Sequence, residues 1–265
     1  MSDIPVVILC GGQGTRMRGG TLTKKEQVEN GGRPIIWHVM RIYSAFGYNR
    51  FVLALGSGAE EIKRYFVNYE AMSRDVTMQL GGPIHRDPLL AMQYHGTADH
   101  PRWQVTLADT GLYTEKASRL LRLSDYLGGK RFFVTYGDGV GNVDIDALVA
   151  FHKAHGRLAT ITSVRVPFQY GILEAGDDDQ VTAYQQKPDL PYWINAGFML
   201  FEREVLALIG NDTDVHLERK ILPELVSQGQ LMRYRHPGFW RSMDTLKDTM
   251  VLEEMWQERA PWKVW

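Results

Sequence analysis

Several features that mark other protein classes are rare or missing in this sequence. Cys10 is its only cysteine, so no disulfide can form within one chain. No apolar run approaches the ~20 residues that a membrane-spanning helix needs, and no charged-then-apolar leader stands at the start. We therefore expect a cytoplasmic protein with no membrane partner, in which Cys10 is a small buried apolar side chain.

A strong charge imbalance is also missing. The 30 lysines and arginines nearly cancel the 31 acidic residues and leave a formal net charge of −1. A surface that coats nucleic acid needs excess positive charge, so we expect no nucleic-acid partner and only local cations around any bound polyanion. Hydrophobic residues make up 44% of the 265 positions, enough for a sizeable core. Because no repeat, low-complexity tract or clear linker interrupts the chain, we predict a single domain over residues 1–265.

What the sequence does contain is an alternation of strand-like and helix-like segments. Such alternation is typical of α/β proteins. We predict an α/β, Rossmann-like fold with a mostly parallel sheet flanked by helices. The predicted strands cover residues 6–10, 51–55, 132–136, 159–166, 181–184 and 194–201, and the predicted helices cover 34–46, 60–72, 144–155 and 246–259.

The alternation breaks between residues 73 and 111. Glycine and proline recur in this segment, no helical period survives, and the alternating residues 76–80 favour a β-ribbon. A long irregular excursion within a compact domain is usually functional or forms an interaction surface. We predict an inserted ribbon or loop over residues 73–111.

The stretch VVILCGGQGTR carries the strongest functional signal. An apolar strand ends at Gly11 and Gly12, and Gly14, Thr15 and Arg16 follow. Glycines let backbone N–H groups approach an anion, and arginine binds phosphate oxygens with two donors. A P-loop would need Gly-Lys-Ser/Thr here, and a dinucleotide fingerprint would need a third glycine where Met17 stands. The loop therefore predicts a polyphosphate site of another kind, and the missing glycine argues against a nicotinamide dehydrogenase.

Two carboxylates are candidates for a metal site. Asp138 stands between two glycines directly after the strand at 132–136, where ligands bind in open α/β sheets. Asp244 precedes the predicted C-terminal helix, and considered alone it is better read as the N-cap of that helix. Asp138 could also be an ordinary turn residue. As ligands, both would suit Mg²⁺, which prefers hard carboxylate oxygens and bridges substrate phosphates.

Taken together, these motifs resemble the sugar-phosphate nucleotidyltransferase family and, within it, the glucose-1-phosphate cytidylyltransferase group. The resemblance covers nearly the whole chain. The family signature matches at residues 11–16 and the next block at 28–35. The blocks that favour the narrower group lie at residues 105–111, 136–140, 151–156, 236–240, 243–245 and 260–263.

The resemblance implies a Mg²⁺-dependent condensation of CTP with a sugar 1-phosphate, giving a CDP-sugar and pyrophosphate. It implies catalytic roles for Arg16, Lys25, Asp138 and Lys187, and metal binding by Asp138 and Asp244. The implied nucleotide-binding residues are Gly11, Gly12, Gly14, Thr15, Arg16, Lys25, Thr110, Gly137 and Asp138. The implied sugar-phosphate-binding residues are Gly171, Gln186, Lys187, Asn195 and Gly197. The group also implies a homo-oligomer, larger than a dimer, contacted through the inserted ribbon.

The chain departs from the family pattern at three places. Residues 23–26 read Thr-Lys-Lys-Glu where the family has Lys-Pro-Lys-Pro, so Glu26 adds a negative charge near the phosphates. Gln186 replaces a glutamate that accepts hydrogen bonds from sugar hydroxyls, and residues 56–58 lack a nucleotide-side lysine. These changes fall in the substrate pocket, so the alternative to a glucose-1-phosphate-like acceptor is the same CTP chemistry on another sugar, a polyol or a phosphonate. A degenerate nucleotide-binding regulator is the second alternative.

Overall fold

The computed structural model describes residues 4–12, 25–79, 92–97, 102–168, 170–189, 191–210 and 214–265. Its centre is an eight-stranded sheet in the order β13–β10–β14–β8–β1–β4–β7, with β15 paired to β10. Strands β1, β4, β7 and β8 run parallel, whereas β14 is antiparallel to both β8 and β10. The predicted α/β fold with a central sheet flanked by helices is confirmed. The strands are β1 (Val6–Leu9), β4 (Arg50–Leu55), β7 (Gln104–Asp109), β8 (Arg131–Tyr136), β10 (Ala159–Val164), β13 (Ile194–Asn195), β14 (Met199–Glu202) and β15 (Leu231–Arg235).

The first strand shows why the sheet is covered on both faces. Successive side chains of a strand point to opposite sides, and in β1 both sets are buried. Val6 and Ile8 pack in one hydrophobic cluster with α1 (Ile35–Ala45) and α6 (Ile145–His155). Val7 and Leu9 pack in a second cluster with α4 (Lys116–Arg122) and α7 (Leu222–Ser227). A continuous apolar run is what a strand buried on both faces requires.

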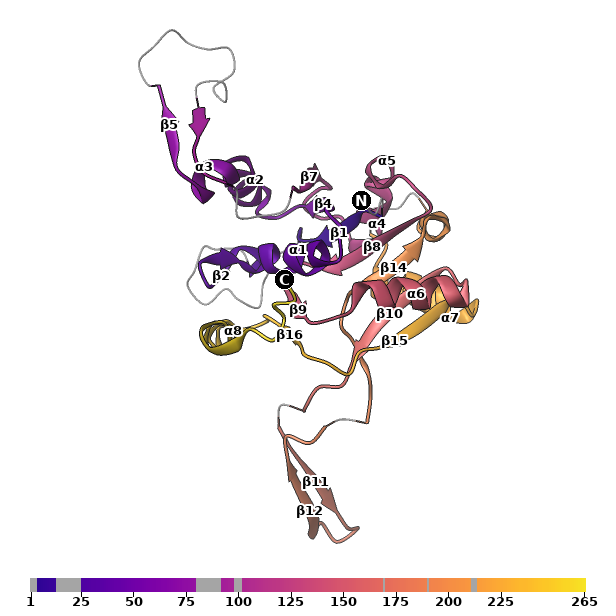
Figure 1. Ribbon diagram of the computed structural model, residues 1–265. Coiled ribbons are helices and arrows are strands. Elements are labelled where there is room, and N and C mark those ends of the chain that lie inside the picture. The colour runs from indigo at the N-terminus through magenta and orange to yellow at the C-terminus, as the bar shows by residue number, and fades with distance from the viewer. Residues whose placement is uncertain are drawn as a thin grey trace.

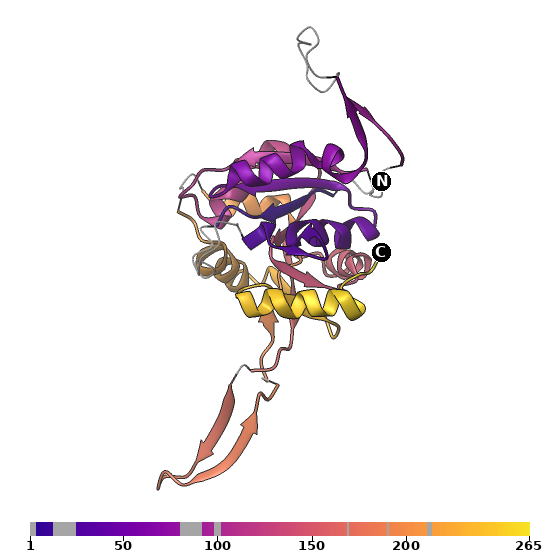
Figure 2. The same cartoon turned by 90° about the vertical axis from the view of Figure 1, so that its left-hand side faces the viewer.

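Two β-ribbons project from this body in opposite directions (Figures 1 and 2). The first pairs β5 (Val76–Met78) with β6 (Met92–Tyr94) and lies in the predicted insertion. The second pairs β11 (Gly171–Ala175) with β12 (Val181–Gln186). The predicted insertion 73–111 was too long at its C-terminal end, because β7 pairs in parallel with β4 and belongs to the central sheet.

Local conformation explains where several predicted elements end or divide. The predicted strand 194–201 is two strands, because Gly197 and Phe198 adopt φ values of 74° and 46° between β13 and β14. The predicted helix 60–72 is divided into α2 (Ala59–Val67) and α3 (Tyr69–Ser73) at Asn68. Helix α8 (Leu246–Arg259) has the predicted bounds. The remaining elements are η2 (Lys25–Gln27), β2 (Glu29–Asn30), β3 (Arg33–Pro34), α5 (Ser124–Leu127), β9 (Gly139–Gly141), η4 (Arg203–Leu208), η5 (Leu217–Ile221) and β16 (Trp240–Ser242).

The sequence predicts no membrane-spanning segment and a buried Cys10. Among the described residues, no helix has both the length and the apolar character that crossing a membrane would need. Cys10 is completely buried, and its thiol lies 3.6 Å from the carbonyl oxygen of Ala54. Burial, followed by the nearby charge of Glu26, raises the pKa of this thiol. Cys10 is therefore the buried side chain that the sequence predicts.

Candidate active site

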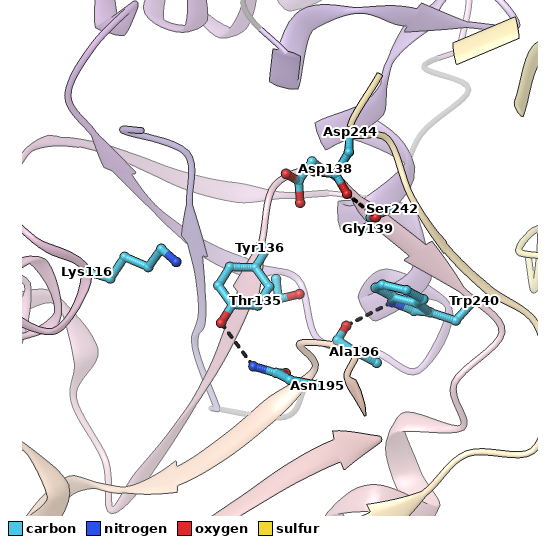
Figure 3. A pocket seen from close by; sticks show the side chains of 10 residues that line it. All are labelled: Lys116, Thr135, Tyr136, Asp138, Gly139, Asn195, Ala196, Trp240, Ser242 and Asp244. Atoms are coloured by element: carbon cyan, nitrogen blue, oxygen red, sulfur yellow. Dashed lines mark hydrogen bonds between the residues drawn. The ribbon is translucent and has the colours of Figure 1, made fainter. Parts of the chain in front are cut away.

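A cavity of about 250 Å³ opens where β8 ends, at the carboxyl edge of the parallel strands (Figure 3). This is the place where open α/β sheets bind ligands. Its walls come from four stretches of the chain that lie far apart in sequence. The lining residues are Lys116, Thr135, Tyr136, Asp138, Gly139, Asn195, Ala196, Trp240, Ser242 and Asp244.

A small antiparallel pair of strands brings the two candidate metal ligands to this cavity. Strand β16 pairs with β9, so that Ser242 lies opposite Gly139. The backbone N–H of Met243 also donates to the carbonyl oxygen of Asp138, at 2.9 Å. Asp138 and Asp244 therefore line the same cavity, and the Ser242 hydroxyl donates to Asp244 Oδ2 at 2.5 Å.

The N-cap interpretation of Asp244 is wrong. The N-cap of α8 is Thr245, whose hydroxyl accepts from the backbone N–H of Asp248, while the Asp248 carboxylate accepts from the N–H of Thr245. This reciprocal capping box satisfies the first turn of the helix. Asp244 is not needed as the cap, and its carboxylate faces the cavity (Figure 3).

The donor set in the cavity fits a hard divalent cation. Mg²⁺ is usually held by one or two carboxylates, with waters and substrate phosphates completing its shell. Asp138 and Asp244 supply two such carboxylates. Within the described ranges, no group of three or more His, Cys, Asp and Glu side chains could hold a metal ion by itself. The chain therefore offers the partial shell that a substrate-bridging cation needs.

On the other wall of the cavity, Lys116 and Tyr136 share the carboxylate of Glu218. Lys116 forms an ion pair with Glu218 and lies 5.0 Å from the centre of the Tyr136 ring. The Tyr136 hydroxyl donates to Glu218 Oε1 at 2.8 Å and accepts from Asn195 Nδ2 at 3.2 Å. Burial would raise the pKa of Glu218, but the hydrogen bonds from Lys116 and Tyr136 outweigh it and hold that pKa below its usual value. The Tyr136 hydroxyl thereby orients the Asn195 side chain, and the Lys116–Glu218 ion pair lies at this wall of the cavity.

Buried Arg119 holds the start of the glycine loop. Its guanidinium donates to the carbonyl oxygens of Gly11 and Leu55 and to the Thr110 hydroxyl, at 3.2, 2.9 and 2.6 Å. These three acceptors stand just after β1, at the end of β4 and just after β7. Gly11 and Gly12 are described, and Gly12 is exposed where a ligand could reach it. Thr110 instead is only 1% exposed, and its hydroxyl donates to the Leu55 carbonyl oxygen at 2.6 Å.

Gly137 lies against the buried side chain of Glu26. A Cβ atom at Gly137 would approach Glu26 Cγ to 3.0 Å and Cys10 Cβ to 3.4 Å. Glu26, one of the departures from the family pattern, is only 8% exposed. Its carboxylate side chain therefore packs beneath the turn that carries Asp138.

The predicted sugar-phosphate residues are divided between the cavity and the second ribbon. Asn195 lines the cavity, and a Cβ at Gly197 would approach Tyr136 Cδ2 to 3.1 Å. Gly171 pairs with Gln186 at the foot of the β11–β12 ribbon, and Lys187 follows with a φ of 48°. The Tyr184 hydroxyl donates to Gln186 Oε1. None of these three ribbon residues lines the cavity within the described part of the chain.

Some predicted site residues lie outside the described residues. These are Gly14, Thr15 and Arg16 of the loop, and Lys25 is described only as the first residue of η2. Conversely, sequence reasoning missed Lys116, Glu218 and Trp240 as site residues. Trp240 belongs to the block at residues 236–240 that supports the family resemblance. No local sequence pattern marks Lys116 or Glu218 as site residues. Tertiary packing of α4 against η5 is what brings them together.

Comparison with known proteins agrees with this geometry. The sequence profile of the nucleotidyl transferase family matches residues 5–254. The chain belongs to the nucleotidyl transferase family. The glucose-1-phosphate cytidylyltransferase of Salmonella typhi is 41% identical over 98% of this chain and 98% of its own. The probable glucose-1-phosphate cytidylyltransferase of Bacillus subtilis (strain 168) is 36% identical over 98% of this chain and 99% of its own.

A solved structure supports the same fold. HddC from Yersinia pseudotuberculosis, complexed with GMP-PN, aligns with a TM-score of 0.67. The alignment covers 95% of this chain and 98% of that chain, at 18% sequence identity. At this identity the likeness shows the fold alone.

The family match and the two cytidylyltransferase relatives confirm the predicted family resemblance and the prediction of a nucleotidyltransferase enzyme.

Proposed function

We propose that this protein is a Mg²⁺-dependent cytidylyltransferase that condenses CTP with a sugar 1-phosphate and releases a CDP-sugar and pyrophosphate. The observation that carries the proposal is the convergence of Asp138 and Asp244 on one cavity at the carboxyl end of β8. The full-length likeness to glucose-1-phosphate cytidylyltransferases supports the choice of nucleotide and product.

The reaction needs positioning and charge neutralisation more than proton transfer. An anionic phosphate oxygen of the sugar 1-phosphate attacks the α-phosphorus of CTP, and the bond from that phosphorus to the β-phosphate oxygen breaks. The attacking group is already an anion, so no strong general base is required. Groups that hold both substrates in line and neutralise developing charge supply the acceleration.

Asp138 and Asp244 would hold Mg²⁺ at the α-phosphate. Bound there, the cation would neutralise negative charge on the phosphate oxygens. The Ser242 hydroxyl, which donates to Asp244 Oδ2 at 2.5 Å, orients one of the two carboxylates. The pairing of β16 with β9 keeps both on one rigid frame.

On the nucleotide side, the loop that begins at Gly11 and Gly12 would bind the triphosphate. Gly14, Thr15 and Arg16 would hold the β- and γ-phosphates of the leaving group, and Lys25 would bridge phosphates near the attacked phosphorus. Arg119 supports this role indirectly, because it ties Gly11 to the ends of β4 and β7. Gly137 and Thr110 would support the nucleotide, with Thr110 acting through Arg119.

On the acceptor side, Asn195 and Gly197 would line the sugar pocket against Tyr136. Lys187 would clamp the sugar phosphate from the ribbon foot, with Gly171 and Gln186 beside it. Gln186 carries no charge, and its Oε1 is already an acceptor for Tyr184. These two features of Gln186 support the alternative hypothesis of an acceptor other than glucose 1-phosphate.

The first experiment is pyrophosphate release with Mg²⁺, four nucleoside triphosphates and a panel of phosphorylated sugars, polyols and phosphonates. We expect turnover with CTP and a phosphorylated acceptor, and none when Mg²⁺ is removed with EDTA. Re-addition of Mg²⁺ should restore the rate, which controls for loss of folding. Measurable CTP binding without turnover of any acceptor would instead support the nucleotide-binding regulator.

We further propose a homo-oligomer larger than a dimer, contacted through the β5–β6 ribbon. This ribbon projects from the body, and an isolated two-stranded hairpin is only marginally stable in water. Light scattering at assay concentration tests the proposal directly. A monomeric mass would contradict it.

A further inference from the structure

Three arginines surround one tryptophan on the surface of the central sheet. The guanidinium carbons of Arg165 and Arg233 each lie 5.2 Å from the centre of the Trp193 ring, and that of Arg235 lies 5.8 Å from it. All three arginines are exposed, whereas Trp193 is half-buried. We call these four residues the arginine–tryptophan cluster.

Strand register places this cluster beside the active-site cavity. Asn195, which lines the cavity, pairs with Ser163 of β10, and Ser163 pairs in turn with Arg235 of β15. Directly paired residues of neighbouring strands point to the same face. Trp193 precedes Asn195 by two residues, a separation of about 7 Å in extended chain. The cluster therefore flanks the wall that Asn195 forms.

The cluster also lies between the cavity and the foot of the second ribbon. Beyond Arg165 and Trp193 the two chain segments continue side by side, through the isolated bridge between Pro167 and Asp189. They then reach the pair of Gly171 and Gln186. A ligand that extends from the cavity toward the ribbon foot would pass the three guanidinium groups.

No ion pair among the described residues balances the positive charge of the cluster. Within the described residues, no carboxylate forms an ion pair with Arg165, Arg233 or Arg235. Asp189, the acidic residue on the adjoining segment, makes none with them. Contact with one half-buried indole stabilises each cation only weakly, and like charges gathered at one ring repel. An anion held by several guanidinium forks would relieve this repulsion.

We propose that the arginine–tryptophan cluster binds a second anionic group of the acceptor, a phosphate, phosphonate or carboxylate distal to the phosphate that reacts. The proposal rests on the proposed function, since it names the acceptor class for the same site. The reacting phosphate lies in the cavity with Asp138 and Asp244, and the distal anion lies beyond Asn195. Neutral Gln186 at the ribbon foot adds no opposing charge.

The test compares acceptors that differ only in the distal group. Pyrophosphate release with CTP is measured for glucose 1-phosphate, glucuronic acid 1-phosphate and glucose 1,6-bisphosphate. Wild-type protein is compared with the double variant R165A/R235A. The matched control is R157A/R259A, which removes two exposed arginines elsewhere on the surface. Thermal unfolding of each variant reports whether the fold is intact.

We expect wild-type kcat/KM to be highest for an acceptor with two acidic groups. The cluster variant should lose about tenfold per arginine for that acceptor, the scale of one lost charge-assisted hydrogen bond, and change less than twofold for glucose 1-phosphate. The control variant should change neither. Equal losses for all acceptors, or no preference in wild-type protein, would overturn the proposal.

Two further arms separate the cluster from its alternatives. Isothermal titration of the same acceptors into wild-type and R165A/R235A protein measures binding without turnover. If the wild-type cluster binds the acceptor with two acidic groups but no turnover follows, only the proposed function is contradicted. Inorganic phosphate that competes with glucose 1,6-bisphosphate but not with glucose 1-phosphate supports the proposal. If inorganic phosphate instead alters kcat for glucose 1-phosphate without competing with either acceptor, the cluster binds a separate effector. That result would overturn the proposal.

Discussion

Arg119 Nη2 lies 3.2 Å from the carbonyl oxygen of Gly11, and this contact leaves no room for a side chain at Gly11. A Cβ added there would stand 2.4 Å from Arg119 Nη1. Gly11, at the start of the glycine loop, therefore has a structural reason to be glycine besides its proposed approach to phosphate. It lets a buried guanidinium join the ends of three parallel strands.

The first prediction concerns the two adjacent glycines of the loop. G11A should lower the free energy of unfolding by about 1–3 kcal/mol, the usual cost of overpacking, and should raise the KM for CTP. G12A is the matched control, because a Cβ at Gly12 meets nothing within 4 Å. Urea denaturation measures both variants. Equal stability of G11A and G12A would show that Arg119 moves aside without cost.

The second prediction separates the metal role of Asp244 from helix capping. D138N and D244N should each reduce kcat by about 10³, on the scale of losing one group that stabilises charge in the transition state, with little change in stability. T245A should lower the free energy of unfolding by about 1 kcal/mol, as loss of an N-cap does, with kcat nearly unchanged. Steady-state kinetics and urea denaturation check the pair. A D244N variant that is fully active would remove Asp244 from the metal site.

The third prediction concerns Tyr136 and binding of the sugar phosphate. Y136F removes the hydroxyl that accepts a hydrogen bond from Asn195 Nδ2 and donates one to Glu218. We expect a roughly tenfold higher KM for the sugar phosphate, the scale of about one hydrogen bond, with a smaller change in kcat. Y126F alters an exposed tyrosine elsewhere and is the control. Burial and the neighbouring charge of Glu218 raise the pKa of Tyr136, so the wild-type KM should not change through ionisation of Tyr136 between pH 7 and 9.

The fourth prediction is a pH dependence of stability at the C-terminal segment. His38 is fully buried; its Nε2 lies 2.9 Å from the Asn30 carbonyl oxygen, and its Nδ1 accepts from the Trp262 indole at 3.3 Å. This arrangement requires neutral imidazole, and burial lowers the pKa of His38 from 6.5 to about 4. The unfolded chain therefore binds more protons between these values.

The stabilising contribution of neutral His38 is complete above pH 6.5 and is lost as the pH falls toward 4. We expect a loss of about 2 kcal/mol between pH 7 and pH 5 from this residue. Because burial also lowers the pKa of His152 to about 4, wild-type protein carries both effects. The difference in pH slope between wild-type protein and H38Q isolates His38. Identical slopes would contradict the prediction.

Much of the fold could be predicted because it depends on local patterns. The apolar run before Gly11 is the buried strand that its pattern predicts. The helix predicted over residues 246–259 matches α8, although its N-cap is Thr245 and not Asp244. The turn at Asp138 was predictable for the same reason, since glycines directly follow an apolar strand. Strand β7 was missed, because its half-buried residues stand next to a segment rich in glycine and proline.

Residue types and short-range order in the sequence by themselves determined the alternation of strands and helices, the glycine loop and the presence of two candidate carboxylates. Only the tertiary structure decided which of them meet. Pairing of β16 with β9 brings Asp244 to Asp138, and packing of α4 on η5 brings Lys116 to Glu218. The register of β13, β10 and β15 gathers three arginines at Trp193. Such contacts depend on strand pairing and helix packing between distant segments, and no local pattern specifies them.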